Sequence, residues 1–246
     1  MPTTLPFGLP LYCERLGDGP WAEPLNAVSN AAFFIAALVA FVHWRQKGGT
    51  DRPALVLILI AAMVGVGSLA WHTFRSPMTL IMDVVPIQIF VFGYFILALR
   101  RFFTLGWPVT GLFLGLFLAI TLAVKHFVPT STLAGGAQYI PALITLYLFG
   151  AALVIETRIS MHRDMPLTGR AAATSDARHF PRLKAGYALL YAGLVFALSL
   201  TARTLDLPFC PQFGLGLHFF WHILNGVTMA MLLLAAIQHG PQQQSS

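Results

Sequence analysis

Charged residues are scarce in this sequence. Asp, Glu, Lys and Arg make up 10% of its 246 residues, whereas a soluble globular domain carries about 25%. So few charges cannot cover the water-exposed surface of a protein of this size, which excludes an ordinary soluble enzyme. No stretch interleaves basic and aromatic residues, so we expect no nucleic-acid partner despite the net charge of +6.

Cysteine is nearly absent as well. Only Cys13 and Cys210 are present, so the sequence lacks the closely spaced cysteine pairs that bind zinc through sulfur. From the residues alone two interpretations stay open: a disulfide formed in an oxidising compartment, or two free thiols. The first eleven residues contain no Lys or Arg, so we expect no cleaved signal peptide.

Long apolar runs dominate what is present. Hydrophobic residues make up 57% of the chain, and its mean hydropathy is +0.73. A helix needs about 20 apolar residues to cross the hydrocarbon core of a bilayer. We therefore predict an all-α integral membrane protein, a single domain over residues 1–246 with seven transmembrane helices. The spans are expected at residues 23–44, 53–74, 78–99, 106–124, 137–156, 184–202 and 215–237.

The basic residues predict how the helices are oriented. If the N-terminus is outside, the outer segments hold four of the 15 Lys and Arg residues and the inner segments hold the other eleven. Cytoplasmic loops carry an excess of Lys and Arg, so we expect the N-terminus outside and the C-terminus inside. The longest inner segment, about 157–183, is expected to be a mobile connection. The four outer cations are Arg15, Arg75, Lys125 and Arg203.

Five polar residues lie within the apolar runs at suggestive spacings. Ser68 and His72 are four residues apart in the second span, Asp83 lies early in the third, and His218 and His222 are four apart in the seventh. A spacing of four places two side chains on one face of a helix. With a rise of 1.5 Å per residue, all five lie within about 10–12 Å of the outer helix ends.

This pattern predicts a metal site. Three imidazoles that leave a fourth position open are typical of catalytic zinc. Asp83 would then exchange protons with the reacting groups, and Ser68 would form a hydrogen bond beside the metal. The alternative is that each histidine is an ordinary hydrogen-bonded core residue.

Three segments carrying these residues resemble one family. YCERLGDGPWAEPLNAVSN, GVGSLAWHTF with MDVVP downstream, and RTLDLPFC leading to HFFWHILNG resemble the alkaline ceramidase family of seven-helix membrane hydrolases, from residue 12 to about 226. The resemblance implies a bacterial-type member that hydrolyses the amide bond of ceramide, or of a related N-acyl lipid, to a fatty acid and a long-chain amine.

The resemblance also implies roles for individual residues. The zinc ligands would be His72, His218 and His222, with Ser68 and Asp83 as the polar pair beside the metal. Cys13 and Cys210 match positions that the family joins by a disulfide.

A calcium site near the N-terminus is a further implication of the resemblance. Glu14 and Glu23 match two of its carboxylate ligands, whereas Leu11 and Leu16 stand where the family uses an acid and an amide. Calcium prefers six to eight oxygen ligands. The alternative is that Glu14 forms an ion pair with a basic residue, Arg15 or Arg203, and fixes the N-terminal segment.

One rival function shares the same Ser, Asp and His signature. The progestin and adipoQ receptor group would make this chain a metal-containing seven-helix receptor with its N-terminus inside. The cation distribution and the YCER segment favour the hydrolase. We expect a lipid substrate, no obligatory protein partner, and a location in the bacterial inner membrane with the site toward the periplasmic side.

Overall fold

The structure is a computed structural model that describes residues 12–15, 17–164 and 169–240. Seven helices in this part of the chain are long and apolar enough to cross a membrane, and the described residues contain no strand. The predicted class, an all-α integral membrane protein, is confirmed. The helices are α1 (Pro24–Ser29), which continues into α2 (Ala31–Gln46), α3 (Arg52–Phe74), α4 (Pro77–Arg101), α5 (Trp107–Phe127), α6 (Ile140–Asp164), α7 (Gly169–Leu205) and α8 (His218–Gln238).

Local sequence signals fix where several helices begin. The Ser76 hydroxyl accepts a hydrogen bond from the Thr79 N–H, and Pro77 occupies the first helical position of α4. The Asp51 side chain caps α3 in the same way, through the Ala54 N–H. Such caps satisfy N–H groups that the first turn of a helix leaves without a partner.

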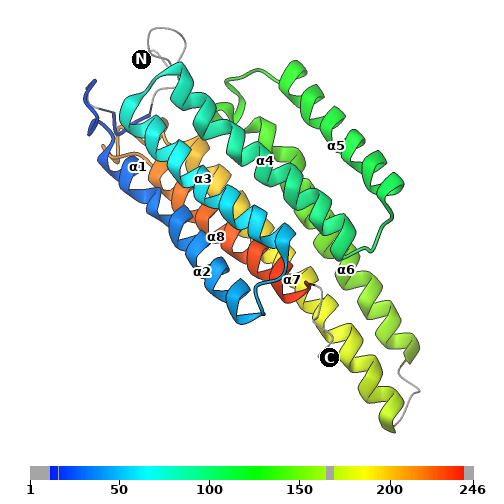
Figure 1. Ribbon diagram of the computed structural model, residues 1–246. Coiled ribbons are helices and arrows are strands. Elements are labelled where there is room, and N and C mark those ends of the chain that lie inside the picture. Colours follow the sequence, from blue (N-terminus) through cyan, green and yellow to red (C-terminus); the bar gives the residue numbers. More distant parts are fainter. Residues whose placement is uncertain (1–11, 16, 165–168, 241–246) are drawn as a thin grey trace.

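The prediction of a mobile connection at 157–183 is wrong for residues 157–164 and 169–183, which are helical; residues 165–168 lie outside the described part of the chain. Helix α6 runs to Asp164 and α7 begins at Gly169, so the two helices continue past the predicted span ends and extend beyond the rest of the bundle (Figure 1). The length of an apolar run predicts only the part of a helix that faces lipid. The extensions of α6 and α7 are polar, so the apolar runs did not predict them. An ion pair between Arg182 and Glu156 (2.9 Å) and a hydrogen bond between His179 Nε2 and Asp164 (3.0 Å) join the two helices.

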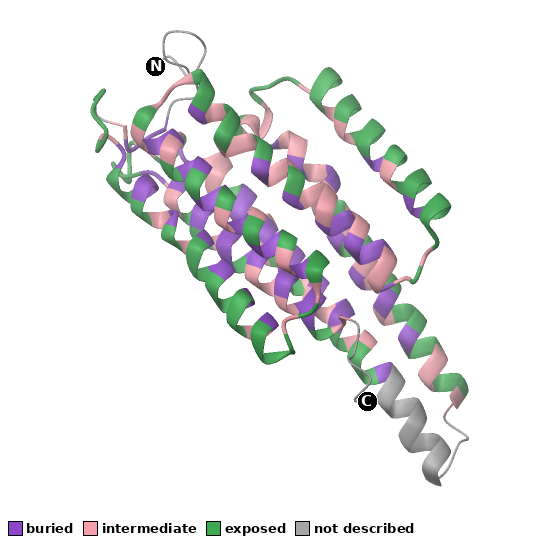
Figure 2. Ribbon diagram, viewed as in Figure 1, coloured by how far each residue is buried: buried purple, intermediate pink, exposed green. Residues whose placement is uncertain are grey.

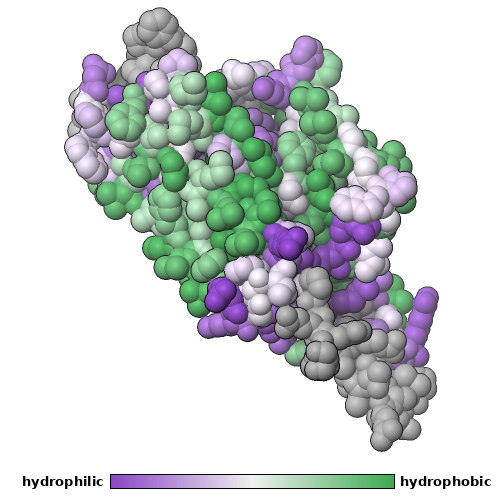
Figure 3. Space-filling view, in the orientation of Figure 1, coloured by the Kyte–Doolittle hydropathy of each residue, from purple (hydrophilic) through white to green (hydrophobic). Residues whose placement is uncertain are grey.

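The helices are unequally buried. Helix α8 lies among α2, α3 and α7, whereas α5 stands at the edge of the bundle (Figures 1 and 2). In the most apolar 18-residue stretch of each helix, 61% of the residues are buried in α8 and 11% in α5. Apolar residues cover the middle of the visible face, and hydrophilic residues gather mostly toward its ends (Figure 3). This surface suits a protein with lipid around its middle. The chain's most buried span therefore carries two of the predicted metal ligands.

Helices α3 and α4 approach each other closely beside the predicted site. A side-chain carbon at Gly67 would collide with the backbone carbonyl of Met82, so only glycine fits there. The next residue on each helix is a predicted site residue, Ser68 on α3 and Asp83 on α4. The close contact thus sets these two polar side chains next to each other.

Candidate metal centre

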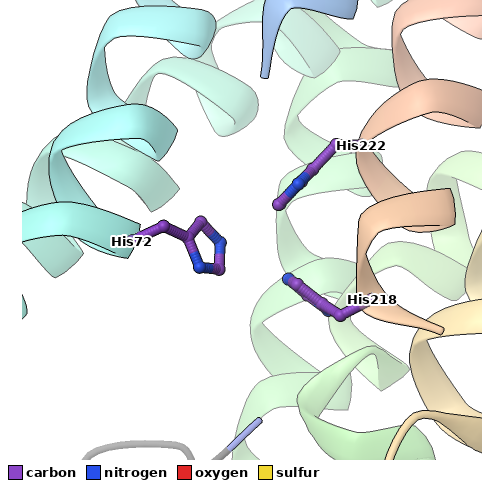
Figure 4. A group of neighbouring side chains, drawn as sticks. All are labelled: His72, His218 and His222. Carbon is purple, nitrogen blue, oxygen red and sulfur yellow. The ribbon is translucent and has the colours of Figure 1, made fainter. Parts of the chain in front are cut away.

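The three predicted histidines meet inside the bundle. His72 lies in the last turn of α3, and His218 and His222 lie in the first two turns of α8. One nitrogen from each ring lies within 4.8 Å of the others, and all three side chains are buried. Figure 4 shows His72 facing the two α8 rings from the opposite helix. The arrangement could hold one metal ion, and it is the only such group of three His, Cys, Asp or Glu residues in the described part of the chain.

Hydrogen bonds orient two of the rings. His72 Nδ1 lies 2.6 Å from Glu23 Oε2, and His222 Nδ1 lies 2.8 Å from Ser29 Oγ. Because the Ser29 hydroxyl donates to the Asn26 carbonyl, its oxygen can accept a hydrogen bond from the His222 Nδ1–H. Ring N–H groups held at Nδ1 leave the Nε2 lone pairs available for a metal.

The donor set fits zinc. His72 Nε2 is buried and has no hydrogen-bond partner among the described residues, and the same is true of His218 Nδ1. Buried polar atoms without a partner are costly, and a metal ion at the histidine centre would satisfy His72 Nε2, whose ring already uses Nδ1 for Glu23. Three imidazoles, two of them with an outer hydrogen-bond partner, match the usual construction of a catalytic zinc site.

Glu23 immediately precedes α1 and accepts four hydrogen bonds. Its Oε1 accepts from Arg15 (3.0 Å) and Arg75 (2.5 Å), and its Oε2 accepts from His72 (2.6 Å) and the Asn26 amide (3.2 Å). Burial by itself would raise the pKa of the Glu23 carboxyl group. The hydrogen bond and charge of His72, together with the charge of Arg75, outweigh it and hold the pKa below its ordinary value.

Two more buried carboxylates fix the backbone around the site. Glu14 accepts from the N–H groups of Leu25 (2.5 Å) and Asn26 (2.8 Å) in the first turn of α1. Asp206 Oδ1 accepts from Leu217 (2.8 Å) and His218 (2.9 Å) at the start of α8. Asp206 Oδ2 also accepts from the Cys13 N–H at 3.0 Å. Both acids therefore act as helix caps, and neither of the predicted Glu14 ion pairs, with Arg15 or with Arg203, appears among the described ion pairs.

The segment before α1 covers the histidines. A disulfide joins Cys13 to Cys210, with the two Cα atoms 5.4 Å apart. Next to it the Tyr12 ring packs on His218, with 4.0 Å between ring centroids. Burial raises the pKa of the Tyr12 hydroxyl, which accepts a hydrogen bond from Trp71. The phenol thus stays neutral and closes one side of the centre.

Ser68 and Asp83 form a polar pair next to the metal centre. The Ser68 side chain is buried, and its hydroxyl lies within hydrogen-bonding reach of the half-buried Asp83 carboxylate. Asp83 does not belong to the group of candidate ligand atoms, so its oxygens are available for other chemistry.

The bundle encloses an apolar cavity whose lining includes α8 residues that neighbour His222 in the chain. Trp221, which directly precedes His222, lines it together with Asn225 one turn further along α8. Its walls are mostly aromatic and aliphatic, and its deeper end reaches Ala98 and Leu232. Aromatic residues reach into it from several helices, namely Phe33, Phe90, Phe117, Phe149 and Phe196.

Several residues that build the centre were not predicted from the sequence. Ser29 binds His222, Arg75 binds Glu23, and Asp206 caps α8. Asp206 lies in the RTLDLPFC segment, but no spacing rule connects it with a helix that begins twelve residues later. The predicted Glu14 and Glu23 lie near each other, both in contact with Asn26, but their oxygens bind N–H donors, which does not fit the predicted calcium site.

Fold and site together define the class of protein: a multi-span membrane protein with a buried three-histidine centre that could hold a metal ion. The chain matches the model of the Ceramidase family over residues 19–245, and it belongs to that family. Family membership implies a hydrolase that acts on amides of the ceramide kind and has a lipid substrate. No curated protein and no solved structure matches the chain.

Proposed function

We propose that this protein is a zinc-dependent intramembrane amidase that hydrolyses ceramide or a related N-acyl lipid to a fatty acid and a long-chain amine. The observation that carries the proposal is the convergence of three buried imidazoles on one point. The Ser68 and Asp83 pair lies next to them, and the same bundle encloses an apolar cavity lined by Trp221, the residue before His222. The family match favours this function over the receptor-like alternative.

The residues divide the work of amide hydrolysis between them. A bound zinc ion would supply a Lewis acid that polarises a carbonyl and lowers the pKa of water toward about 7. The Asp83 carboxylate would accept a proton from the attacking water and return it to the nitrogen of the leaving amine. The Ser68 hydroxyl would donate a hydrogen bond to the carbonyl oxygen as negative charge develops there.

The cavity supports an acyl-lipid substrate. Its aromatic walls begin at Trp221, next to His222, and continue to Leu232 about three turns deeper along α8. A fatty-acyl chain that lies along these walls would place its amide carbonyl beside the histidines. Because the acyl chain comes from a bilayer that is as apolar as the cavity walls, the cavity would act by fitting and orienting the chain, with little hydrophobic free energy gained.

We further propose that the metal centre faces the periplasmic side of a bacterial inner membrane, with the N-terminus outside and the C-terminus inside. The excess of Lys and Arg at the opposite end of the helices supports this orientation. So does the Cys13–Cys210 disulfide at the histidine end, since disulfides persist in oxidising compartments. A reporter that works only in the cytoplasm should be active when it is fused to the C-terminus. Activity of a reporter that works only in the periplasm would contradict the orientation.

The activity can be tested directly. The full-length protein, purified and returned to lipid vesicles, is incubated with ceramides and other N-acyl lipids while free fatty acid is measured. We expect release that is lost when the metal is stripped and regained with zinc. His222→Ala should abolish it, whereas His126→Ala, at an exposed histidine at the end of α5, should not. Unchanged release after His222→Ala would refute the mechanism.

A further inference from the structure

Glu23 has no unused position at which to bind a cation. A carboxylate has two oxygens with about four lone-pair sites. The Glu23 side chain is fully buried, and Arg15, Arg75, His72 and Asn26 supply one donor to each site. The carboxylate thus links two guanidinium groups on one oxygen to a candidate metal ligand on the other.

The two arginines are fixed in position. The side chains of Arg15 and Arg75 are 5% and 4% exposed. The Arg75 guanidinium lies over the ring of Trp71 at 4.4 Å and over that of Tyr12 at 4.8 Å from the ring centroids. Its backbone is in the left-handed conformation (φ 50°) that ends α3, three residues after His72. Cation–π contacts and a helix end therefore hold the charge beside Glu23.

A calcium ion does not fit among these groups. Calcium needs six to eight oxygen ligands, but both Glu14 oxygens accept backbone N–H groups and both Glu23 oxygens accept side-chain donors. A divalent cation would also have to approach two buried guanidinium groups. The guanidinium groups of Arg15 and Arg75 supply the positive charge next to Glu23 that a calcium ion would otherwise supply.

We infer that Arg15 and Arg75, instead of a calcium ion, hold Glu23 against His72 and thereby set the affinity of the histidine centre for zinc. This inference rests on the proposed function in one respect, that His72 is a zinc ligand. The arginines act through Glu23 and touch neither metal nor substrate, so they are positioning residues. Partners that orient a metal-binding histidine contribute about 10–100-fold to metal affinity.

The first test measures calcium. The purified full-length wild-type protein is equilibrated with calcium by dialysis, and bound calcium is determined by elemental analysis. The zinc dissociation constant is then measured by competition with a zinc-binding dye, with and without millimolar calcium. We expect no stoichiometric calcium and a zinc dissociation constant unchanged within about twofold. One bound calcium per chain, or zinc affinity that rises with calcium, would overturn the inference.

The second test asks whether Arg75 acts through Glu23. Arg75→Met should raise the zinc dissociation constant about 10–100-fold, and Arg75→Lys, which keeps the charge, should restore much of it. In a Glu23→Gln background the same Arg75→Met change should have little further effect, because coupled residues are not additive. Full additivity, or wild-type zinc affinity in Arg75→Met, would show that Arg75 does not position Glu23. Lys125→Met, an exposed charge at the end of α5, is the matched control.

The two ideas fail in different ways. A wild-type protein that binds no zinc under any condition removes the proposed function, and the affinity claim with it. A wild-type protein that binds zinc and hydrolyses lipid only when calcium is present keeps the function and removes the inference. If Arg75→Met does not fold, the calcium measurement on the wild type still decides: stoichiometric calcium overturns the inference, and its absence with unchanged zinc affinity supports it.

Discussion

Two regions of the helical bundle use charge differently: the histidine end and the part where α6 and α7 extend beyond the other helices. At the histidine end, Glu14, Glu23 and Asp206 are buried, and each carboxylate accepts two or more hydrogen bonds. At the far end, where α6 and α7 extend beyond the bundle, the side chains of Arg182 and Glu156 are 39% and 59% exposed. Buried charges must be paired or they destabilise the fold, whereas exposed pairs contribute at most about 1 kcal/mol. A buried carboxylate at the histidine end therefore fixes the position of its neighbours, whereas an exposed carboxylate at the far end contributes little to stability.

The largest expected effect is at the metal ligands. His218→Ala removes one of three imidazoles, and we expect lipid hydrolysis to fall by about 10⁴-fold or more because the Lewis acid is lost. Rates of fatty-acid release and zinc content should fall together. Zinc retained at one ion per chain with full activity would show that His218 is not a ligand.

The next effect separates chemistry from metal binding. Asp83→Asn keeps the shape of the side chain but removes the proton acceptor, so we expect the turnover rate to fall by about 10²–10⁴-fold. Zinc content should be unchanged, because Asp83 lies outside the ligand group. Asp18→Asn, at an exposed site on the N-terminal segment, serves as the control. Loss of zinc in Asp83→Asn would instead make Asp83 a ligand.

A structural carboxylate at the same end should show a smaller effect. Asp206→Ala leaves the N–H groups of Cys13, Leu217 and His218 without their acceptor. Unsatisfied buried groups cost about 1–3 kcal/mol each, so the free energy of unfolding should fall by about 3 kcal/mol or more. Thermal or denaturant unfolding in detergent measures this. A change below about 0.5 kcal/mol would show that Asp206 contributes no more to stability than an exposed charge does, which would contradict its role as a helix cap.

The smallest effect is expected at the far end itself. Arg182→Ala breaks the exposed pair with Glu156, and we expect the free energy of unfolding to change by about 0.5 kcal/mol or less. Lipid hydrolysis should be unchanged within about twofold. A loss as large as that of Asp206→Ala would end the distinction between the two regions.

The sequence predicted the parts of the molecule that a bilayer dictates. The apolar run at 53–74 became Arg52–Phe74, and the one at 78–99 became Pro77–Arg101, because lipid requires a helix of fixed apolar length. The i, i+4 spacing likewise placed His218 and His222 on one face. The helix extensions at 157–183 were missed because polar helical turns outside the bilayer leave no hydropathy signal.

Contacts between distant segments could not be read from the sequence. Glu23 and His72 lie 49 residues apart in the chain, and Ser29 and His222 lie 193 apart, so only the folded bundle shows which acceptor serves which ring. The resemblance implied a role for Glu23 as a calcium ligand, whereas in the structure its oxygens accept hydrogen bonds from Arg15, Arg75, His72 and Asn26. The ion pair of Glu23 with Arg75, a residue that belongs to no motif, instead supports a role in positioning His72.

The central claim, that three imidazoles from α3 and α8 share one metal ion, is tested most directly by elemental analysis of the purified full-length protein. We predict one zinc per chain in the wild type, one in His126→Ala and none in His218→Ala. A wild-type protein without zinc even after equilibration with the ion, or equal zinc in His218→Ala, would contradict it.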